Sequence, residues 1–140
     1  MDQQEAPKAG GAGARRKILV ADDDPIVLKF LHALLTDAGY EVLTADDGEK
    51  ALQGIREARP DLVVLDLVMP YRDGFEICRA VRESPATRGV PIIILSVKEK
   101  EGDVLRCFEL GADDYIRKPF NALELLARIK KVLDQRSRQA

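Results

Sequence analysis

The stretch from Asp61 to Pro70 (DLVVLDLVMP) constrains the fold of this chain more than any other. Its residues 62–65 are all apolar, without the alternation that marks a half-exposed strand. Such a run is typical of a strand buried on both faces, as at the centre of a parallel sheet. Pro70 and Gly74 then indicate a loop before a helical pattern. We therefore expect Asp66 at the carboxyl end of a central strand, where open α/β sheets bind ligands, although a turn-capping role remains the alternative.

The size and charge of the chain indicate one ordinary globular domain. It has 140 residues, of which 46% are hydrophobic and 33% charged, with a net charge of −2. One domain with a substantial core fits that length, and nothing in the charge balance predicts a nucleic-acid surface. We expect no direct nucleic-acid partner, no membrane partner and a cytoplasmic location, because no apolar run resembles a signal peptide or a membrane helix.

The two cysteines, Cys78 and Cys107, lie in separate helical patterns and form neither a C-x-x-C motif nor a zinc spacing. We interpret them as small buried hydrophobic residues in a reducing compartment.

A strand followed by a helix recurs five times along the chain, which predicts a parallel sheet with helices on both faces and right-handed crossovers. The expected strands are Lys17–Ala21, Tyr40–Thr44, Leu62–Leu65, Pro91–Leu95 and Asp114–Arg117. Tyr40–Thr44 is less apolar than the strands expected before and after it, so we place it at a sheet edge.

The helix signals between the strands are equally regular. Asp24 and Pro25 suit the N-cap and first position of one helix, and Gly39 suits its end. We expect the domain to span residues 17–134. Residues 1–16, rich in Gly, Ala and charge, are expected to be a disordered tail, and residues 135–140 a short polar tail.

Five residues whose side chains can bind a metal or take part in phosphoryl transfer lie just after strands of the predicted sheet: Asp22, Asp23, Asp66, Ser96 and Lys118. Parallel strands open on one edge, so these side chains should converge. Two carboxylates about 4 Å apart repel by roughly 4 kcal/mol at an effective dielectric of 20, and a bound Mg²⁺ would relieve that repulsion with oxygen ligands. A carboxylate can attack phosphorus, while a lysine and a hydroxyl stabilise the phosphoryl oxygens. The set predicts an acyl-phosphate site.

Four motifs in order, I-L-V-A-D-D-D-P, D-L-V-V-L-D-L-V-M-P with the later D-G, I-I-I-L-S and G-A-D-D-Y-I-R-K-P-F, carry a family resemblance. From Lys17 to about Leu133 the chain resembles a response-regulator receiver domain, the phosphoacceptor part of two-component signalling. The resemblance implies a flavodoxin-like (βα)5 fold with strand order 2-1-3-4-5. It also implies a switch module rather than an enzyme acting on other substrates, with a histidine kinase or phosphotransfer protein as partner.

Carried over by motif position, the resemblance implies roles for the acidic edge. Asp66 would accept the phosphoryl group from a phosphohistidine. Asp22, Asp23 and Asp66 would hold Mg²⁺ together with the backbone carbonyl of Val68. Lys118 would pair with Asp66 and then with the phosphoryl oxygens.

The resemblance further implies a conformational switch. Ser96 would move toward the phosphoryl group, and Tyr115 would turn into the space it leaves. The peptide bond before Pro119 would be cis. One departure is Val97, because the family usually has a small residue after the switch hydroxyl; Lys98, next to it, would attract anionic donors.

A partner surface is expected on the last two helices and the fifth strand. Receivers of the winged-helix transcription-factor subfamily, which this chain resembles in part, dimerise there by charge pairs, although Val104 replaces an arginine usual in them. We expect phosphorylation-dependent dimerisation or partner docking through the charged residues of this face. These residues are Arg106, Glu109, Asp113, Asp114, Glu124 and Arg128.

Three alternatives bear on the function. A phosphatase of the haloacid-dehalogenase kind would want a second aspartate where Val68 stands. A nucleotide-binding enzyme would want the motif G-x-x-x-x-G-K-[ST], which the sequence lacks. A receiver-like scaffold that binds partners without phosphorylation remains as the alternative.

Overall fold

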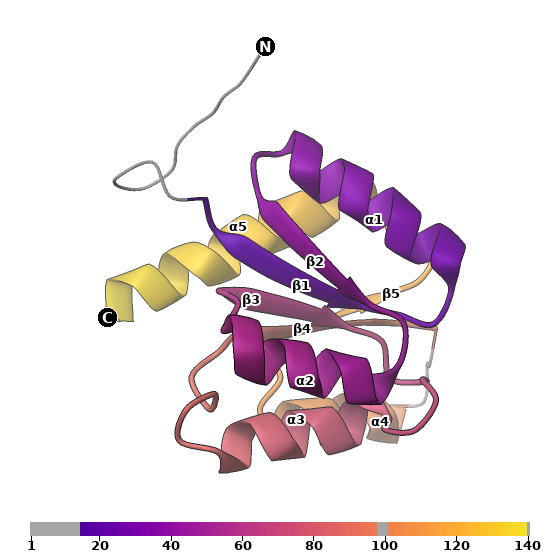
Figure 1. Cartoon of the computed structure of the whole chain (residues 1–140), viewed down its shortest axis with the longest axis vertical. Coiled ribbons are helices and arrows are strands. Elements are labelled where there is room, and N and C mark those ends of the chain that lie inside the picture. Colours follow the sequence, from indigo (N-terminus) through magenta and orange to yellow (C-terminus); the bar gives the residue numbers. More distant parts are fainter. Residues whose placement is uncertain (1–14, 98–100, 140) are drawn as a thin grey trace.

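A computed structural model describes residues 15–97 and 101–139 as alternating strands and helices (Figure 1). The five strands are β1 Lys17–Ala21, β2 Glu41–Ala45, β3 Leu62–Leu65, β4 Ile92–Ser96 and β5 Asp114–Arg117. They form one sheet in the order β2-β1-β3-β4-β5, and every neighbouring pair is parallel. The predicted α/β fold and strand order are therefore confirmed, and β2 lies at an edge of the sheet as expected.

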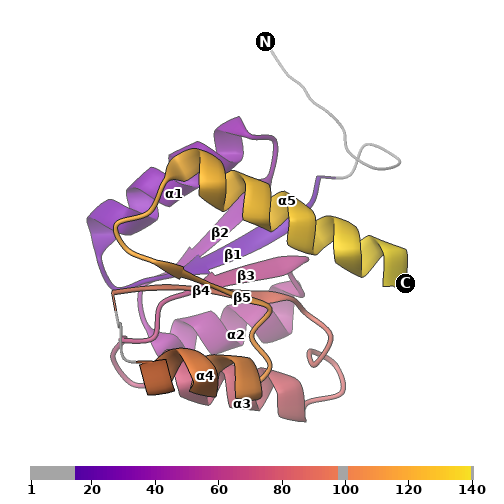
Figure 2. The ribbon, with the colours of Figure 1, turned by 180° about the vertical axis from the view of Figure 1, so that it is seen from behind.

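The helices cover both faces of the sheet. They are α1 Pro25–Asp37, α2 Gly48–Ala58, α3 Gly74–Glu83, α4 Glu101–Glu109 and α5 Ala122–Gln139. Figures 1 and 2 show α1 and α5 packed on one face and α2, α3 and α4 on the other. This is the two-layer cover that parallel strands need because both of their faces are apolar.

The hydrophobic core divides into two clusters according to the two-residue period of the strands. In β3, Val63 and Leu65 join the cluster beneath α2, α3 and α4, which also contains both cysteines. Leu62 and Val64 join the cluster beneath α1 and α5. All four residues of β3 are buried, so the run that suggested a central strand is explained by burial on both sides.

Aspartates cap the helices that open at the carboxyl edge of the sheet. Asp24 accepts a hydrogen bond from the Ile26 amide (2.9 Å), with Pro25 at the first helical position. Asp73 and Glu76 form a reciprocal capping box at the start of α3. Such caps satisfy amides that have no intrahelical partner, and they fix where each strand-to-helix loop ends.

Parts of both segments expected as tails belong to the described structure. The polar tail expected over residues 135–140 is helical as far as Gln139, because α5 continues past its last apolar residues. Arg16, expected within the N-terminal tail, has a carbonyl that accepts a hydrogen bond from the Glu41 amide (2.9 Å). The rest of the expected N-terminal tail, residues 1–14, lies outside the described residues.

Candidate functional site

Asp22 and Asp66 are brought together by the pairing of β1 with β3. Ala21 is paired with Leu65, the last residue of β3, and the Asp66 amide donates to the Ala21 carbonyl (3.0 Å). The Asp22 amide donates to the Ala45 carbonyl at the end of β2 (3.1 Å). Asp22 and Asp66 therefore each follow the last residue of their strand, at the carboxyl edge of the sheet that the sequence predicted.

The three predicted carboxylates form one cluster. One oxygen from each of Asp22, Asp23 and Asp66 lies within 4.8 Å of the others. Asp22 and Asp66 are almost fully buried, at 2% and 6% exposure, whereas Asp23 is exposed. The cluster is thus open on the Asp23 side, and two of its charges lie in surroundings where repulsion is weakly screened.

Lys118 supplies the positive charge at this edge. Its ammonium lies 2.6 Å from Oδ2 of Asp22 and 3.2 Å from Oδ2 of Asp66. The residue follows β5, where its amide donates to the Ser96 carbonyl (3.0 Å), and the bond between Lys118 and Pro119 is cis, as expected.

Burial and charge act in opposite directions on this pair. Burial lowers the pKa of Lys118, but the hydrogen bond with Asp22 and the charge of Asp66 outweigh it, so that the pKa is raised overall. For Asp22, burial raises the pKa more than Lys118 and the Asp24 amide lower it. Three carboxyl groups thus share one ammonium at this edge, an imbalance that a bound cation would relieve.

The loop after β3 shapes the wall beside Asp66. The Val68 amide lies 3.3 Å from Oδ1 of Asp66, and its side chain is 51% exposed. The start of α3 packs against this loop, because a Cβ added to Gly74 would lie 2.7 Å from the Asp66 carbonyl oxygen. Sterics therefore explain the glycine of the Asp73-Gly74 pair in the motif, because a side chain at position 74 would clash with this loop.

The two predicted switch residues lie side by side. Ser96 is fully buried and ends β4, while Tyr115 on the neighbouring β5 is 9% exposed. Burial raises the pKa of Tyr115, and a hydrogen bond with the Ser96 side chain opposes that rise. Tyr115 therefore lies inward in this structure, in contact with the hydroxyl whose movement it is predicted to follow.

Val97 directly follows Ser96 and is 60% exposed. Lys98, which we expected to attract anionic donors, lies outside the described residues.

The predicted partner residues lie on α4, β5 and α5 or the turns between them, but most already have contacts within the chain. Arg128 binds Asp114 (2.9 Å) and Glu124 (2.8 Å). Arg106 lies over the ring of Phe75, 4.1 Å from its centre, and Asp113 belongs to a network described below. Glu109 is exposed. The charges expected to meet a partner are therefore largely paired internally.

An apolar pocket that the sequence analysis did not predict lies beside the site. Ile26, Val27 and Phe30 of α1 line it together with Lys118, Pro119 and Phe120, around a volume of about 410 Å³. Ile26 is 77% and Phe30 49% exposed. The sequence does contain a signal for this pocket, since Ile26 and Phe30 are apolar but lie outside the helical stripe that faces the core.

The parallel sheet and its acidic, lysine-containing edge define an α/β domain of the receiver type. Residues 18–130 match the model of the response regulator receiver domain family, and the chain belongs to that family.

Curated relatives support the same assignment. The chain is 45% identical over 116 residues to the DNA-binding response regulator MtrA of Mycolicibacterium smegmatis, covering 83% of this chain and 50% of the relative. It is 43% identical over 118 residues to the alkaline phosphatase synthesis transcriptional regulatory protein PhoP of Bacillus subtilis, covering 84% and 48%. The chain thus spans about half the length of the curated relatives it matches.

Solved structures agree with the fold. A CheY-like receiver domain protein from Methanospirillum hungatei superposes with a TM-score of 0.86 at 28% identity, over 91% of this chain and all of that one. The receiver domain of a sensor histidine kinase from Pseudomonas aeruginosa, solved with a magnesium ion in its active site cleft, superposes with a TM-score of 0.80 at 31% identity, over 86% and 99%.

The comparisons limit one expectation about partners, that this chain binds no nucleic acid directly. The relatives are named as DNA-binding or transcriptional regulators, so our expectation of no nucleic-acid partner applies only to the matched segment and is withdrawn for any longer protein. Within residues 15–97 and 101–139, no helix is both long and apolar enough to cross a lipid bilayer.

Proposed function

We propose that Asp66 accepts a phosphoryl group from the phosphohistidine of a histidine kinase or phosphotransfer protein. One observation carries this proposal: Asp66, Asp22 and Asp23 converge within 4.8 Å, and the Lys118 ammonium contacts two of them. Among the described carboxylates, Asp22 and Asp66 both combine a strand end, near-complete burial and a contact with Lys118. The family resemblance gives the acceptor role to Asp66.

The reaction is a displacement at phosphorus. An oxygen of Asp66 forms the new P–O bond while the P–N bond to the donor imidazole breaks, and the bonding electrons leave with the imidazole nitrogen. Lys118 lies beside Asp66 and can neutralise charge on the transferred oxygens. Ser96 can donate its hydroxyl proton to a phosphoryl oxygen. Hydrolysis of the acyl phosphate would return Asp66 to its carboxylate form.

The donor set fits Mg²⁺. The cluster offers only carboxylate oxygens, from Asp22, Asp23 and Asp66, and the exposed Asp23 leaves room for coordinated water. The family resemblance adds the backbone carbonyl of Val68 as a further ligand. When bound, Mg²⁺ would neutralise charge on the phosphoryl oxygens and relieve the repulsion among the carboxylates. The magnesium ion in the cleft of the Pseudomonas aeruginosa receiver domain supports this assignment.

The apolar pocket between α1 and the Lys118–Phe120 segment is our proposed docking site for the phosphodonor protein. A donor histidine must reach Asp66, so its carrier must cover this edge, and exposed Ile26 and Phe30 offer it apolar contact area. Ile26→Asp should slow transfer from a phosphorylated kinase or phosphotransfer protein. Transfer from acetyl phosphate, which needs no docking surface, should be unchanged. Equal rates from the protein donor in both forms would exclude this docking site.

The surface of α4, β5 and α5 remains our proposed output face, for self-association or for a partner. Because Arg128 is paired with Asp114 and Glu124, charge pairing with a second copy would require these bonds to open. Association should therefore be weak and salt-sensitive. Light scattering of the phosphorylated protein, with Arg128→Glu as the comparison, tests the dimer; a monomer in every condition leaves only partner docking.

Incubation with acetyl phosphate and Mg²⁺ tests the acceptor role. We expect one alkali-labile phosphoryl group by intact mass, and none in Asp66→Asn. Label that persists in Asp66→Asn would show that another residue is the acceptor. An unlabelled wild type would favour the alternative, a scaffold that binds partners without phosphorylation.

A further inference from the structure

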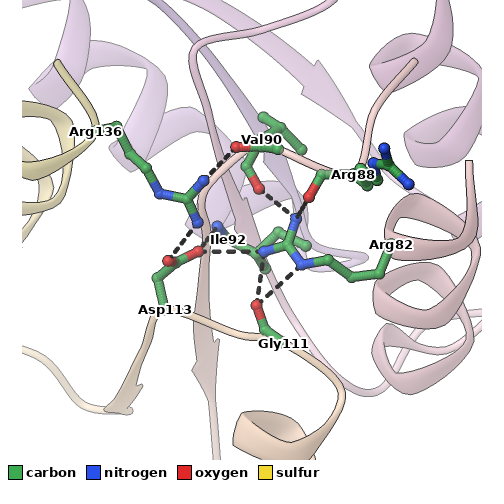
Figure 3. A network of polar contacts seen from close by, with 8 residues as sticks. Arg82, Arg88, Val90, Ile92, Gly111, Asp113 and Arg136 are labelled. Atoms are coloured by element: carbon green, nitrogen blue, oxygen red, sulfur yellow. Dashed lines mark hydrogen bonds and ion pairs between the residues drawn. The ribbon is translucent and has the colours of Figure 1, made fainter. Parts of the chain in front are cut away.

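A network of polar contacts occupies the amino edge of the sheet, opposite the acidic site. Figure 3 shows Arg82 at the end of α3 and Arg136 near the end of α5 reaching toward Asp113, which precedes β5. These elements are distant in sequence, and the proposed phosphoacceptor function does not require the contacts between them.

Arg82 ties α3 to two neighbouring turns. Its guanidinium donates twice to the Gly111 carbonyl (3.1 and 2.6 Å) and also to the carbonyls of Arg88 (2.9 Å) and Val90 (2.6 Å). A Cβ on Gly111 would lie 2.7 Å from Nε of Arg82, and this glycine has a φ of +101°. The turn is thus shaped to receive the arginine, and four bonds to three carbonyls use its planar donor geometry.

Asp113 is the centre of the network, and both of its carboxylate oxygens accept hydrogen bonds. Oδ2 accepts from the Ile92 amide (2.8 Å) and from Arg82 (3.2 Å). Oδ1 accepts from Nη2 of Arg136 (2.6 Å). The Asp113 amide also donates to the Ile92 carbonyl (2.8 Å). The position of this carboxylate is therefore determined by β4 and α3 independently of Arg136.

Arg136 uses that prepared acceptor to hold the end of α5. Leu133 is the last residue of the helix in the hydrophobic core. Beyond it, Arg136 binds Asp113 and the carbonyl of Gly89 in the loop between α3 and β4. Charge-assisted bonds of this kind are stronger than neutral ones. They replace apolar packing as the contact that fixes the last turns.

We propose that Arg82, Asp113 and Arg136 form a clamp that fixes the course of the final turns of α5, separately from the phosphoacceptor site. The clamp holds a helix end that apolar packing alone would leave to fray. It is a positioning device, and Asp113 is its shared acceptor.

Hydrogen exchange measured by mass spectrometry on the whole chain tests the clamp. In Arg136→Gln, amides of residues 134–139 should exchange roughly tenfold faster than in wild type, because a charge-assisted contact is lost. Amides of residues 122–130 should keep their wild-type rates. Lys130→Gln is the matched control, since it removes one positive charge and an exposed ion pair with Asp134 from the same helix, and it should leave residues 136–139 unchanged.

Asp113→Asn provides the second variant. It preserves size and an acceptor for the Ile92 amide, yet it should also speed exchange at the α5 end. Phosphorylation of both variants by acetyl phosphate should match wild type, which separates the clamp from the acceptor proposal. Wild-type exchange at residues 134–139 in Arg136→Gln, or an equal increase in Lys130→Gln, would overturn the clamp.

Discussion

Lys118 and Asp22 form an ion pair of 2.6 Å between residues 96 positions apart in sequence. Both side chains are largely buried, at 15% and 3% exposure. The contact shows that Lys118 is shared between Asp22 and Asp66, whereas the family resemblance implied a pairing with Asp66.

The first prediction concerns Lys118→Met. Removing the ammonium leaves buried carboxylates without compensation, so the free energy of unfolding without Mg²⁺ should fall by about 3 kcal/mol. Urea denaturation measures this change. Lys130→Met, which breaks an exposed pair, should have almost no effect. If the two variants were equally stable, the buried pair would have no structural importance.

A second prediction concerns the metal. If Mg²⁺ binds only the folded chain, it should stabilise the fold by roughly 2.7 kcal/mol at one hundred times Kd. Asp23→Asn should remove most of that gain, because it takes one carboxylate charge from the cluster, and Asp23 is its exposed member. Thermal melts with and without Mg²⁺ provide the measurement. An unchanged Tm at saturating Mg²⁺ would contradict the magnesium assignment.

Val97 leads to a prediction about signal lifetime. Valine is stiff at χ1, and by family resemblance this exposed residue borders the approach to phosphorus. Displacing an attacking group slightly can cost orders of magnitude in rate. We expect slow phosphorylation by acetyl phosphate and a long-lived acyl phosphate, both accelerated in Val97→Ala at unchanged Mg²⁺ affinity. Identical rates in the two proteins would refute this role.

The thiols give a prediction about pH. Burial raises the pKa of Cys78 to about 12 and that of Cys107 to about 11. A folded-state pKa above the unfolded value of about 8.5 means that this contribution to stability is complete below pH 8.5 and is lost as the pH rises toward 11. Iodoacetamide at pH 8 should therefore modify both residues only as fast as the fold opens, and urea should accelerate it. Rapid modification of the native protein would be inconsistent with their burial.

Local patterns were sufficient to predict five alternating strands and helices in a parallel sheet, whereas the strand order followed from the family resemblance. Leu62–Leu65 are apolar because both faces of β3 are covered, and Asp24 with Pro25 marks a helix start through chemistry contained in a few residues. The convergence of Asp22, Asp66 and Lys118 followed from a topological rule, that parallel strands open on one edge.

Contacts between distant side chains could not be predicted in the same way. Arg136 contacts Asp113 and the Gly89 carbonyl, but no residue near Arg136 in sequence indicates these contacts. The sequence therefore predicts only a polar tail at the end of α5. The ion pairs of Asp113 and Arg128 within the chain could not be predicted either, because they depend on packing between elements that are distant in sequence.

Trapping the acyl phosphate tests the central claim most directly. The protein is phosphorylated with acetyl phosphate and Mg²⁺, reduced with borohydride, which converts an aspartyl phosphate to homoserine, and mapped by peptide mass spectrometry. The account predicts reduction at residue 66 alone, dependent on Mg²⁺ and on the phosphodonor. Reduction at Asp22 or Asp23 instead, or at no residue, would contradict the assignment of Asp66 as the phosphoacceptor.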